Sequence, residues 1–458
     1  MSVHGATDEL GAGAIGRLLL RYSLPAIVGM TASSLYNIID RIFIGQGVGA
    51  SAISGLAITL PIMNLAVAFG AMVGVGAAVT ISIRLGEKNA ADATFILGNT
   101  VFLNVVISIA FSIVVLGFLD GILRAFGASS DTLPYAREFM EIILAGNVVT
   151  HLYMGLNNIM RASGYPKKAM AATLLTIGVN VVLAPLMIFG LKWGIRGAAT
   201  ATVCSQITGL AWVLLHFVGR QSSVRFERGC FKPRVRIIKD IISIGMSAFL
   251  LNVCLCLIMS IINLRLVKYG GDFAVGAFGI INSILMFFAM VVLGFTQGMQ
   301  PIAGYNYGAN QWHRVREVFR FTVVAASCVT CTGFLMAECI PELISRAFTT
   351  SRDLTELSTE GMRIVFAMFP LVGFQMVTAN LFQSIGKVQI SILLSLSRQV
   401  LFLIPALFVL SHIFGVKGVW ASMPASDLAA TVLTLIVLKN QVKKAPATAR
   451  NPQVRSCR

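Results

Sequence analysis

The chain has 458 residues, of which 56% are hydrophobic and only 12% charged, and its net charge is +17. Soluble domains usually carry about a quarter charged residues, so an ordinary soluble protein is excluded. Segments of roughly 20 mostly apolar residues, the length that a membrane-spanning helix needs, recur along nearly the whole chain. The expected fold class is therefore an all-α, polytopic membrane protein.

Twelve membrane spans are predicted, at 17–42, 52–83, 94–119, 136–160, 168–190, 195–218, 238–266, 274–303, 318–340, 358–384, 388–411 and 416–438. Of the Lys and Arg residues, 24 lie at the termini and in loops after even-numbered spans, and 11 lie in loops after odd-numbered spans. Because basic loops stay on the cytoplasmic side, both termini are expected in the cytoplasm. The positive charge thus reflects topology in an inner membrane, and nucleic acid is not an expected partner.

The two halves of the chain resemble each other. A shift of 222 residues superimposes Gly76 on Gly298 and Asn158 on Asn380, and the shift slips by one near the end of each half. Two copies with an even number of spans form parallel repeats, with transport between the halves as the default mechanism. The predicted domains are an N-terminal six-helix bundle (1–219), a basic cytoplasmic linker (220–239), a C-terminal six-helix bundle (240–440) and a cytoplasmic tail (441–458).

The first span carries a polar stripe that ends in a carboxylate. Ser33, Tyr36, Asn37 and Asp40 are spaced i, i+3, i+4 and i+7, so they lie on one face of a helix. A carboxylate inside a membrane costs at least about 2.5–3.5 kcal/mol. We interpret Asp40 as a protonatable or cation-binding group, and the alternative is an interfacial aspartate beside Arg41.

Other polar residues within the spans either line a cavity, as substrate-binding candidates, or bond between helices. They are Asn147, His151, Asn158, Gln297, Gln300, Arg398 and Asp427. Arg398 and Asp427 fall in the eleventh and twelfth spans, and the sequence leaves open whether they pair. Pro25 in the first span is either a hinge or an ordinary membrane-helix proline.

Signatures of enzymes and pumps are missing from the sequence. There is no HExxH, GxSG or GxxxxGK[ST] motif, and the five histidines are scattered singly. We therefore expect no enzymatic activity, no metal and no cofactor, and any transport is driven by an ion gradient or is passive.

Four segments carry a family resemblance. The sequence YNIIDRIFIG at 36–45 resembles helix one of the MATE (multidrug and toxic compound extrusion) family, and three further segments agree with that family. These are NNIMRASGYPK at 157–167, QGMQPIAGYNYGA at 297–309 and PASD at 424–427. The resemblance spans essentially the whole chain and is strongest to the MepA-type bacterial branch.

The resemblance implies two six-helix bundles forming a V-shaped cavity in a bacterial inner-membrane protein, which is expected to be a monomer. It implies multidrug efflux, and thus antibiotic resistance and xenobiotic transport, by antiport of organic cations or drugs against H+ or Na+. It places a coupling-ion site at Asp40, Asn180 and Thr202, to which the polar stripe adds Tyr36 and Asn37.

This chain departs from the family pattern in one place. The family usually has a second aspartate just before a proline, where this sequence has Ala184 before Pro185. A site with one carboxylate favours H+, because a dehydrated Na+ prefers several oxygen ligands. The alternative function is a lipid-linked oligosaccharide flippase of a related superfamily, which should line its cavity with several cations, and only Arg161 and Arg398 are candidates.

Overall fold

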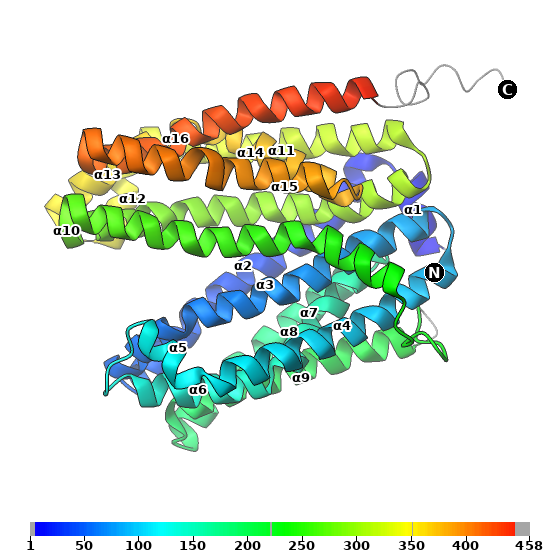
Figure 1. Ribbon diagram of the computed structural model, residues 1–458, viewed down its shortest axis with the longest axis horizontal. Coiled ribbons are helices and arrows are strands. Elements are labelled where there is room, and N and C mark those ends of the chain that lie inside the picture. The colour runs from blue at the N-terminus through cyan, green and yellow to red at the C-terminus, as the bar shows by residue number, and fades with distance from the viewer. Residues whose placement is uncertain (1–4, 220–221, 350, 445–458) are drawn as a thin grey trace. The chain divides into compact units, whose positions relative to one another are not determined.

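The computed structural model describes residues 5–219, 222–349 and 351–444, so residues 445–458 of the predicted tail lie outside the described residues. All regular elements of this described part are helical, which confirms the predicted fold class (Figure 1). They are α1 Gly5–Ala12, α2 Ile15–Gly47, α3 Ala50–Gly86, α4 Ala90–Gly117, α5 Leu119–Ala125, α6 Leu133–Ala145, α7 Asn147–Ala162, α8 Pro166–Pro185, η1 Leu186–Gly190, α9 Gly194–Val218, α10 Val235–Gly308, α11 Trp312–Cys339, α12 Pro341–Phe348, α13 Arg352–Phe366, α14 Phe369–Ser384, α15 Val388–Leu396, η2 Ser397–Leu403 and α16 Ile404–Lys444, where η denotes a π-helix.

Within the described ranges, eight helices are long and apolar enough to cross a membrane. Two of these contain two legs each, because α10 turns at Gly271 and α16 turns at Gly415, both with positive φ. Two further spans are bent pairs, α6 with α7 (53°) and α13 with α14 (51°). Counting each leg and each bent pair once gives the twelve predicted spans.

The chain forms two compact units. Unit 1 comprises the described residues up to Gly13 together with Val28–Asn252, and unit 2 comprises Ala14–Ile27 and the described residues from Val253 onward. The beginning of α2 therefore belongs to unit 2, and the beginning of α10 belongs to unit 1. The predicted domain boundaries at 219 and 240 stay a prediction, and the compact units differ from them by these two exchanged segments.

Close backbone contacts hold each exchanged segment in place. In unit 1 a Cβ on Gly76 of α3 would overlap the carbonyl of Ile241 in α10, and a Cβ on Gly245 would overlap the backbone of α3. In unit 2 a Cβ on Gly298 of α10 would overlap Ser23 of α2. Small residues allow this approach between membrane helices. Gly76 and Gly298 are one of the pairs that the internal repeat superimposes.

The described part of the basic linker is docked on α4 of unit 1. The side chain of Asn99 donates to the carbonyl of Lys232 (3.2 Å) and accepts from the backbone N–H of Arg234 (2.8 Å). The Arg234 guanidinium lies 3.1 Å from the ring centroid of Phe95. These contacts fix the segment that leads into α10.

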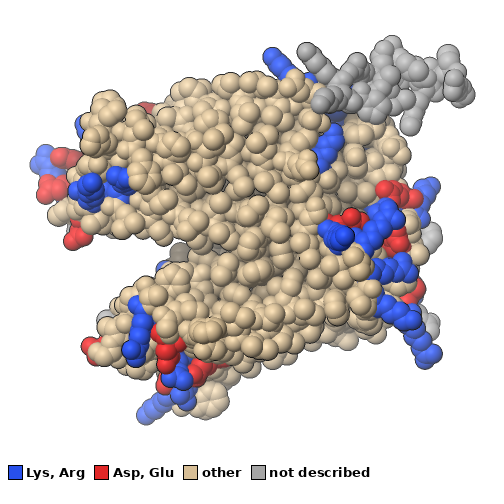
Figure 2. Space-filling view, viewed as in Figure 1, with Lys and Arg blue, Asp and Glu red and all other residues tan. Residues whose placement is uncertain are grey.

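Charged side chains gather at the two ends of the helices in each unit, and a band almost free of charge lies between them (Figure 2). This is the distribution expected for helices that cross a bilayer, because an ionised group in the hydrocarbon core is costly. The charged residues that do lie within the helical spans are therefore the candidates for function.

Candidate functional site

Three helices of unit 1 bring together a cluster of polar side chains, which we call the Asp40 cluster. It consists of Tyr36 and Asp40 on α2, Asn180 on α8, and Thr202 and Ser205 on α9. The Tyr36 hydroxyl lies 3.4 Å from Thr202 Oγ1, and Asn180 Nδ2 donates to Thr202 Oγ1 (3.3 Å) and to Ser205 Oγ (3.5 Å). Asp40 lies one helical turn after Tyr36, and residues at that spacing are neighbours on the helix surface.

The direction of the hydrogen bonds leaves this cluster with too few donors. Thr202 Oγ1 donates its only proton to the carbonyl of Ala198 (3.0 Å), so in its contacts with Tyr36 and Asn180 it acts as the acceptor. Asn180 Oδ1 and Asp40 Oδ1 are both buried without a hydrogen-bond partner. A buried acceptor without a donor is unfavourable, so the cluster has a physical need for a proton or a cation.

Asp40 has no ion-pair partner among the residues that the structure describes. Asn37, also predicted for this site, is exposed on α2. Ala184 is completely buried in an apolar cluster that includes Ile44 and Ile188. One carboxylate, two amide or hydroxyl oxygens and an apolar wall thus make up the site.

The candidates on α7 mostly bond to neighbouring helices of unit 1. Asn147 is 3% exposed, and its Nδ2 donates to Ser108 O and Ser112 Oγ (both 3.4 Å). His151 is 1% exposed, and its Nε2 lies 3.0 Å from the carbonyl of Ala66. Asn158 accepts a hydrogen bond from Arg161. The structure does not bring these residues together with the Asp40 cluster through any contact among the residues it describes.

The candidates on α10 and the proline of α2 lie in unit 2. Gln300 is buried and Gln297 is half-buried, one turn apart ahead of Pro301. Pro25 is buried inside α2, two residues before the point where that helix passes from unit 2 to unit 1. Its missing N–H interrupts the helical ladder there, and its role as a hinge stays a prediction.

A second polar group in unit 2, the Arg398 network, consists of Arg398 on η2, Asp427 and Thr431 on α16, and Gln375 on α14. Arg398 Nε donates to Asp427 Oδ1 (2.7 Å), with side chains 30% and 5% exposed respectively. Gln375 Nε2 donates to Asp427 O and Thr431 Oγ1, while its own Oε1 is buried without a partner. The pairing that the sequence left open is thus present.

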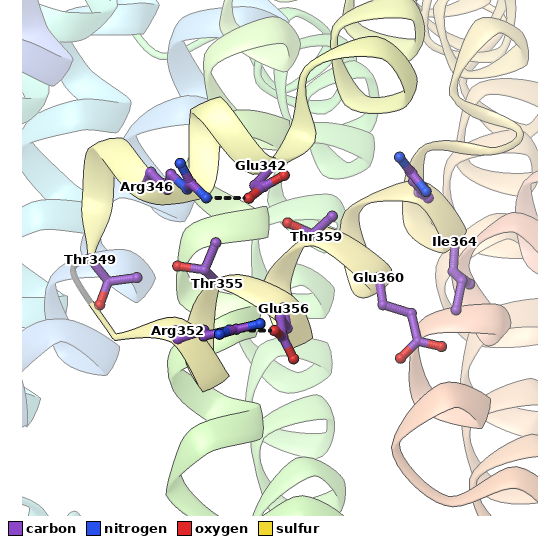
Figure 3. A pocket seen from close by; sticks show the side chains of 10 residues that line it. Glu342, Arg346, Thr349, Arg352, Thr355, Glu356, Thr359, Glu360 and Ile364 are labelled. Carbon is purple, nitrogen blue, oxygen red and sulfur yellow. Dashed lines mark hydrogen bonds and ion pairs between the residues drawn. The ribbon is translucent and has the colours of Figure 1, made fainter.

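A polar pocket of about 1010 Å³ lies at an end of unit 2, between α12 and α13 (Figure 3). Two ion pairs cross its wall, Arg346–Glu342 (2.5 Å) and Arg352–Glu356 (3.0 Å). All four side chains are well exposed, and exposed ion pairs contribute little energy. This pocket does not bury a charge, unlike the two groups above.

The sequence analysis missed two members of these groups. Gln375 stands in the predicted tenth span as the only long polar side chain between Phe369 and Asn380, and a polar residue in an apolar run is the signal that singles out Asp40. Ser205 carries no comparable signal, because serine is common as a small packing residue in membrane helices.

The helical spans, the two units and the polar groups buried within them define a polytopic membrane transporter rather than an enzyme. The sequence pattern of the MatE family matches the chain twice, at residues 25–186 and 248–409. The two matches are of equal length and begin 223 residues apart, in agreement with the internal repeat. The chain belongs to the MatE (MATE) family.

Individual relatives agree with this assignment. The chain is 26% identical to the multidrug export protein MepA of Staphylococcus aureus (strain MSSA476) over 422 residues, which cover 92% of this chain and 93% of that protein. It is 36% identical to the MATE multidrug transporter DinF-BH, solved in complex with a rhodamine dye, covering 94% and 96% of the two chains with a TM-score of 0.87. A MATE structure in a bent conformation shares the fold, with a TM-score of 0.92 over 97% and 99% of the chains at 23% identity.

Proposed function

We propose that this protein is a secondary active antiporter that exports organic, often cationic and amphipathic compounds in exchange for H+, with Asp40 as the coupling carboxylate. The names of MepA and DinF-BH, a multidrug export protein and a multidrug transporter, support the substrate class. The observation that carries the coupling role is the buried, unpartnered Oδ1 of Asp40 beside a second unpartnered acceptor, Asn180 Oδ1.

Protonation changes what the Asp40 cluster needs. A carboxylate is an acceptor only, whereas a carboxylic acid also donates, so a bound proton supplies the donor that the buried acceptors lack. A coupling ion drives transport only if its affinity differs between the two access states. In the proposed cycle, deprotonated Asp40 favours the loaded state, and protonation from the outer side reshapes α2 and releases the compound.

Na+ is the alternative coupling ion at Asp40, Asn180 and Thr202. Hard cations stripped of water are held by several oxygen ligands. The apolar surroundings of Ala184 offer no second carboxylate there, which supports H+. No further metal or cofactor enters the proposed mechanism, and the protein is proposed to act as a monomer in the bacterial inner membrane with both termini in the cytoplasm.

Transport into everted vesicles of the rhodamine dye bound in the DinF-BH structure, under separately imposed H+ and Na+ gradients, tests the proposal. The wild-type protein should move the dye under an H+ gradient, and Asp40→Asn should reduce this transport to the level of empty vesicles at equal protein abundance. The matched control is Asp353→Asn, an exposed aspartate on α13, which should transport normally. Undiminished transport by Asp40→Asn would refute the coupling role, and drive by Na+ alone would refute H+ as the ion.

A further inference from the structure

The Arg398 network holds a cation deep in the membrane-spanning part of unit 2. Arg398 lies ten residues after the start of α15, and at 1.5 Å per residue this is about 15 Å along the helix. Asp427 lies twelve residues after the turn at Gly415, or about 18 Å along the other leg. Both positions are near the middle of a hydrocarbon core about 30 Å thick, far from the phosphates of lipid headgroups.

The two members of this ion pair differ in what they offer to a ligand. The Asp427 side chain is 5% exposed, its Oδ1 accepts from Arg398, and its backbone carbonyl accepts from Gln375. The Arg398 side chain is 30% exposed. A ligand that reaches the network therefore meets the guanidinium first, with the carboxylate behind it.

The guanidinium retains unused donors. Arginine has five N–H donors in a fixed fork, and a single carboxylate occupies at most one edge of that fork. Asp427 takes the edge that contains Nε, and among the described residues no other acceptor bonds to Arg398. The opposite edge has the geometry that binds a carboxylate through two parallel hydrogen bonds.

Two further features fit a binding role. Arg398 lies in a π-helical segment, and such segments are rare and occur frequently at functional sites. An exposed guanidinium at this depth faces a wet cavity rather than lipid, because contact with lipid would be costly. A purely structural ion pair would gain nothing from leaving one edge of the guanidinium accessible.

We propose that Arg398 binds a carboxylate, or a similar planar anionic group, of the exported compound, and that Asp427 is the positioning residue that holds the guanidinium for it. The proposal rests on the proposed export function and deepens it. The substrate range would then include compounds that carry an acidic group as well as a basic one, for which an exporter with only acidic sites has no partner.

A pair of probes isolates this contact: a rhodamine with a free carboxylate, and the same rhodamine with that group esterified. Binding of each to the purified full-length protein is measured by fluorescence polarisation. Arg398→Gln should weaken binding of the free-carboxylate dye by about tenfold or more, as expected for a lost charge-assisted pair. Binding of the ester should change by less than about twofold.

Two further variants separate binding from folding. Arg398→Lys keeps the charge but not the fork, so the preference for the free carboxylate should fall to an intermediate value. Arg265→Gln removes another arginine of unit 2, whose guanidinium lies 3.9 Å from the Phe408 ring centroid, and it should leave the ratio of the two affinities unchanged.

Several outcomes would overturn the proposal. Equal weakening of both dyes by Arg398→Gln would mean that the ion pair only stabilises unit 2. Stronger binding of the ester by that variant would mean that Asp427 receives a cation once Arg398 is removed. Loss of the wild-type preference in nanodiscs of anionic lipid would identify a lipid headgroup as the ligand.

The assay also distinguishes this proposal from the coupling role of Asp40, because it measures binding without any gradient. A normal carboxylate preference in a protein that fails the gradient test would leave Arg398 as a binding residue and refute only the antiport. No binding of either dye would count against both proposals.

Discussion

Asp40 in unit 1 and Asp427 in unit 2 are both carboxylates inside the membrane, and the protein treats them in opposite ways. Asp427 is neutralised by Arg398 at 2.7 Å, whereas Asp40 Oδ1 is buried without a partner. Neither is duplicated by the internal repeat, since the matching positions hold Ile262 and Gln206. A carboxylate paired with a fixed cation keeps its charge, while one without a partner depends on a mobile proton or ion. The comparison therefore separates a binding group from a coupling group.

The largest expected difference lies in stability. Asp427→Ala leaves the Arg398 guanidinium without its partner and should destabilise the protein by about 3–5 kcal/mol, the cost of breaking a buried ion pair. Asp40→Ala removes a charge that has no partner and should change stability by less than about 1 kcal/mol. Thermal and denaturant unfolding of the purified variants measures both. Equal losses of stability would show that Asp40 has a partner after all.

Replacing both members of the ion pair should recover most of that loss. In Arg398→Met with Asp427→Leu no charge is left unpaired, and well-packed apolar residues often replace a buried ion pair at little cost. Unfolding of the double variant should lie within about 1 kcal/mol of the wild type, and the double-mutant cycle gives the coupling energy. The same variant should bind the ester dye but show no preference for the free carboxylate.

The Asp40 cluster should be sensitive to the loss of its shared acceptor. Thr202→Val removes the oxygen that receives hydrogen bonds from Asn180 and Tyr36. The expected cost is about 1–3 kcal/mol for donors left unsatisfied. Thr200→Val on the same helix is the control, because the Thr200 hydroxyl is exposed and bonds only to its own helix. If both variants unfold alike, the inter-helix bonds contribute nothing.

The smallest effect is expected at the edge of the cluster. Tyr36→Phe removes one hydroxyl whose contact with Thr202 is long, at 3.4 Å, so stability should fall by about 0.5–1 kcal/mol. Export should persist, because Asp40 is unchanged. A loss of export as complete as that of Asp40→Asn would instead place the proton pathway through the Tyr36 hydroxyl, which the same vesicle assay would detect.

Much of the fold could be predicted because the membrane imposes simple rules on length and polarity. Apolar runs located the spans, and a charge within such a run drew attention to Asp40, Arg398 and Asp427. The bends could not be predicted in the same way. Gly271 and Gly415 adopt positive φ, but nothing in the sequence distinguishes them from the many glycines that pack between helices.

The composition of the two polar groups depends on packing between helices that are distant in sequence. Arg398 and Asp427 come from different spans, and Gln375 reaches them from a third. The exchange of the first parts of α2 and α10 between the units has no sequence signal except the paired glycines. Gly76 and Gly298 are visible in the repeat, yet their partners Ile241 and Ser23 follow only from the structure.

The exchanged segment of α2 also constrains how the protein is made. Ser23 packs against Gly298, which the ribosome adds about 275 residues later, so at 5–20 residues per second the start of α2 waits roughly 15–60 s for its partner. During this time the first helix to enter the membrane is only partly packed. The N-terminal half therefore cannot complete its own assembly, and final packing of the first helix reports that the second half has been synthesised.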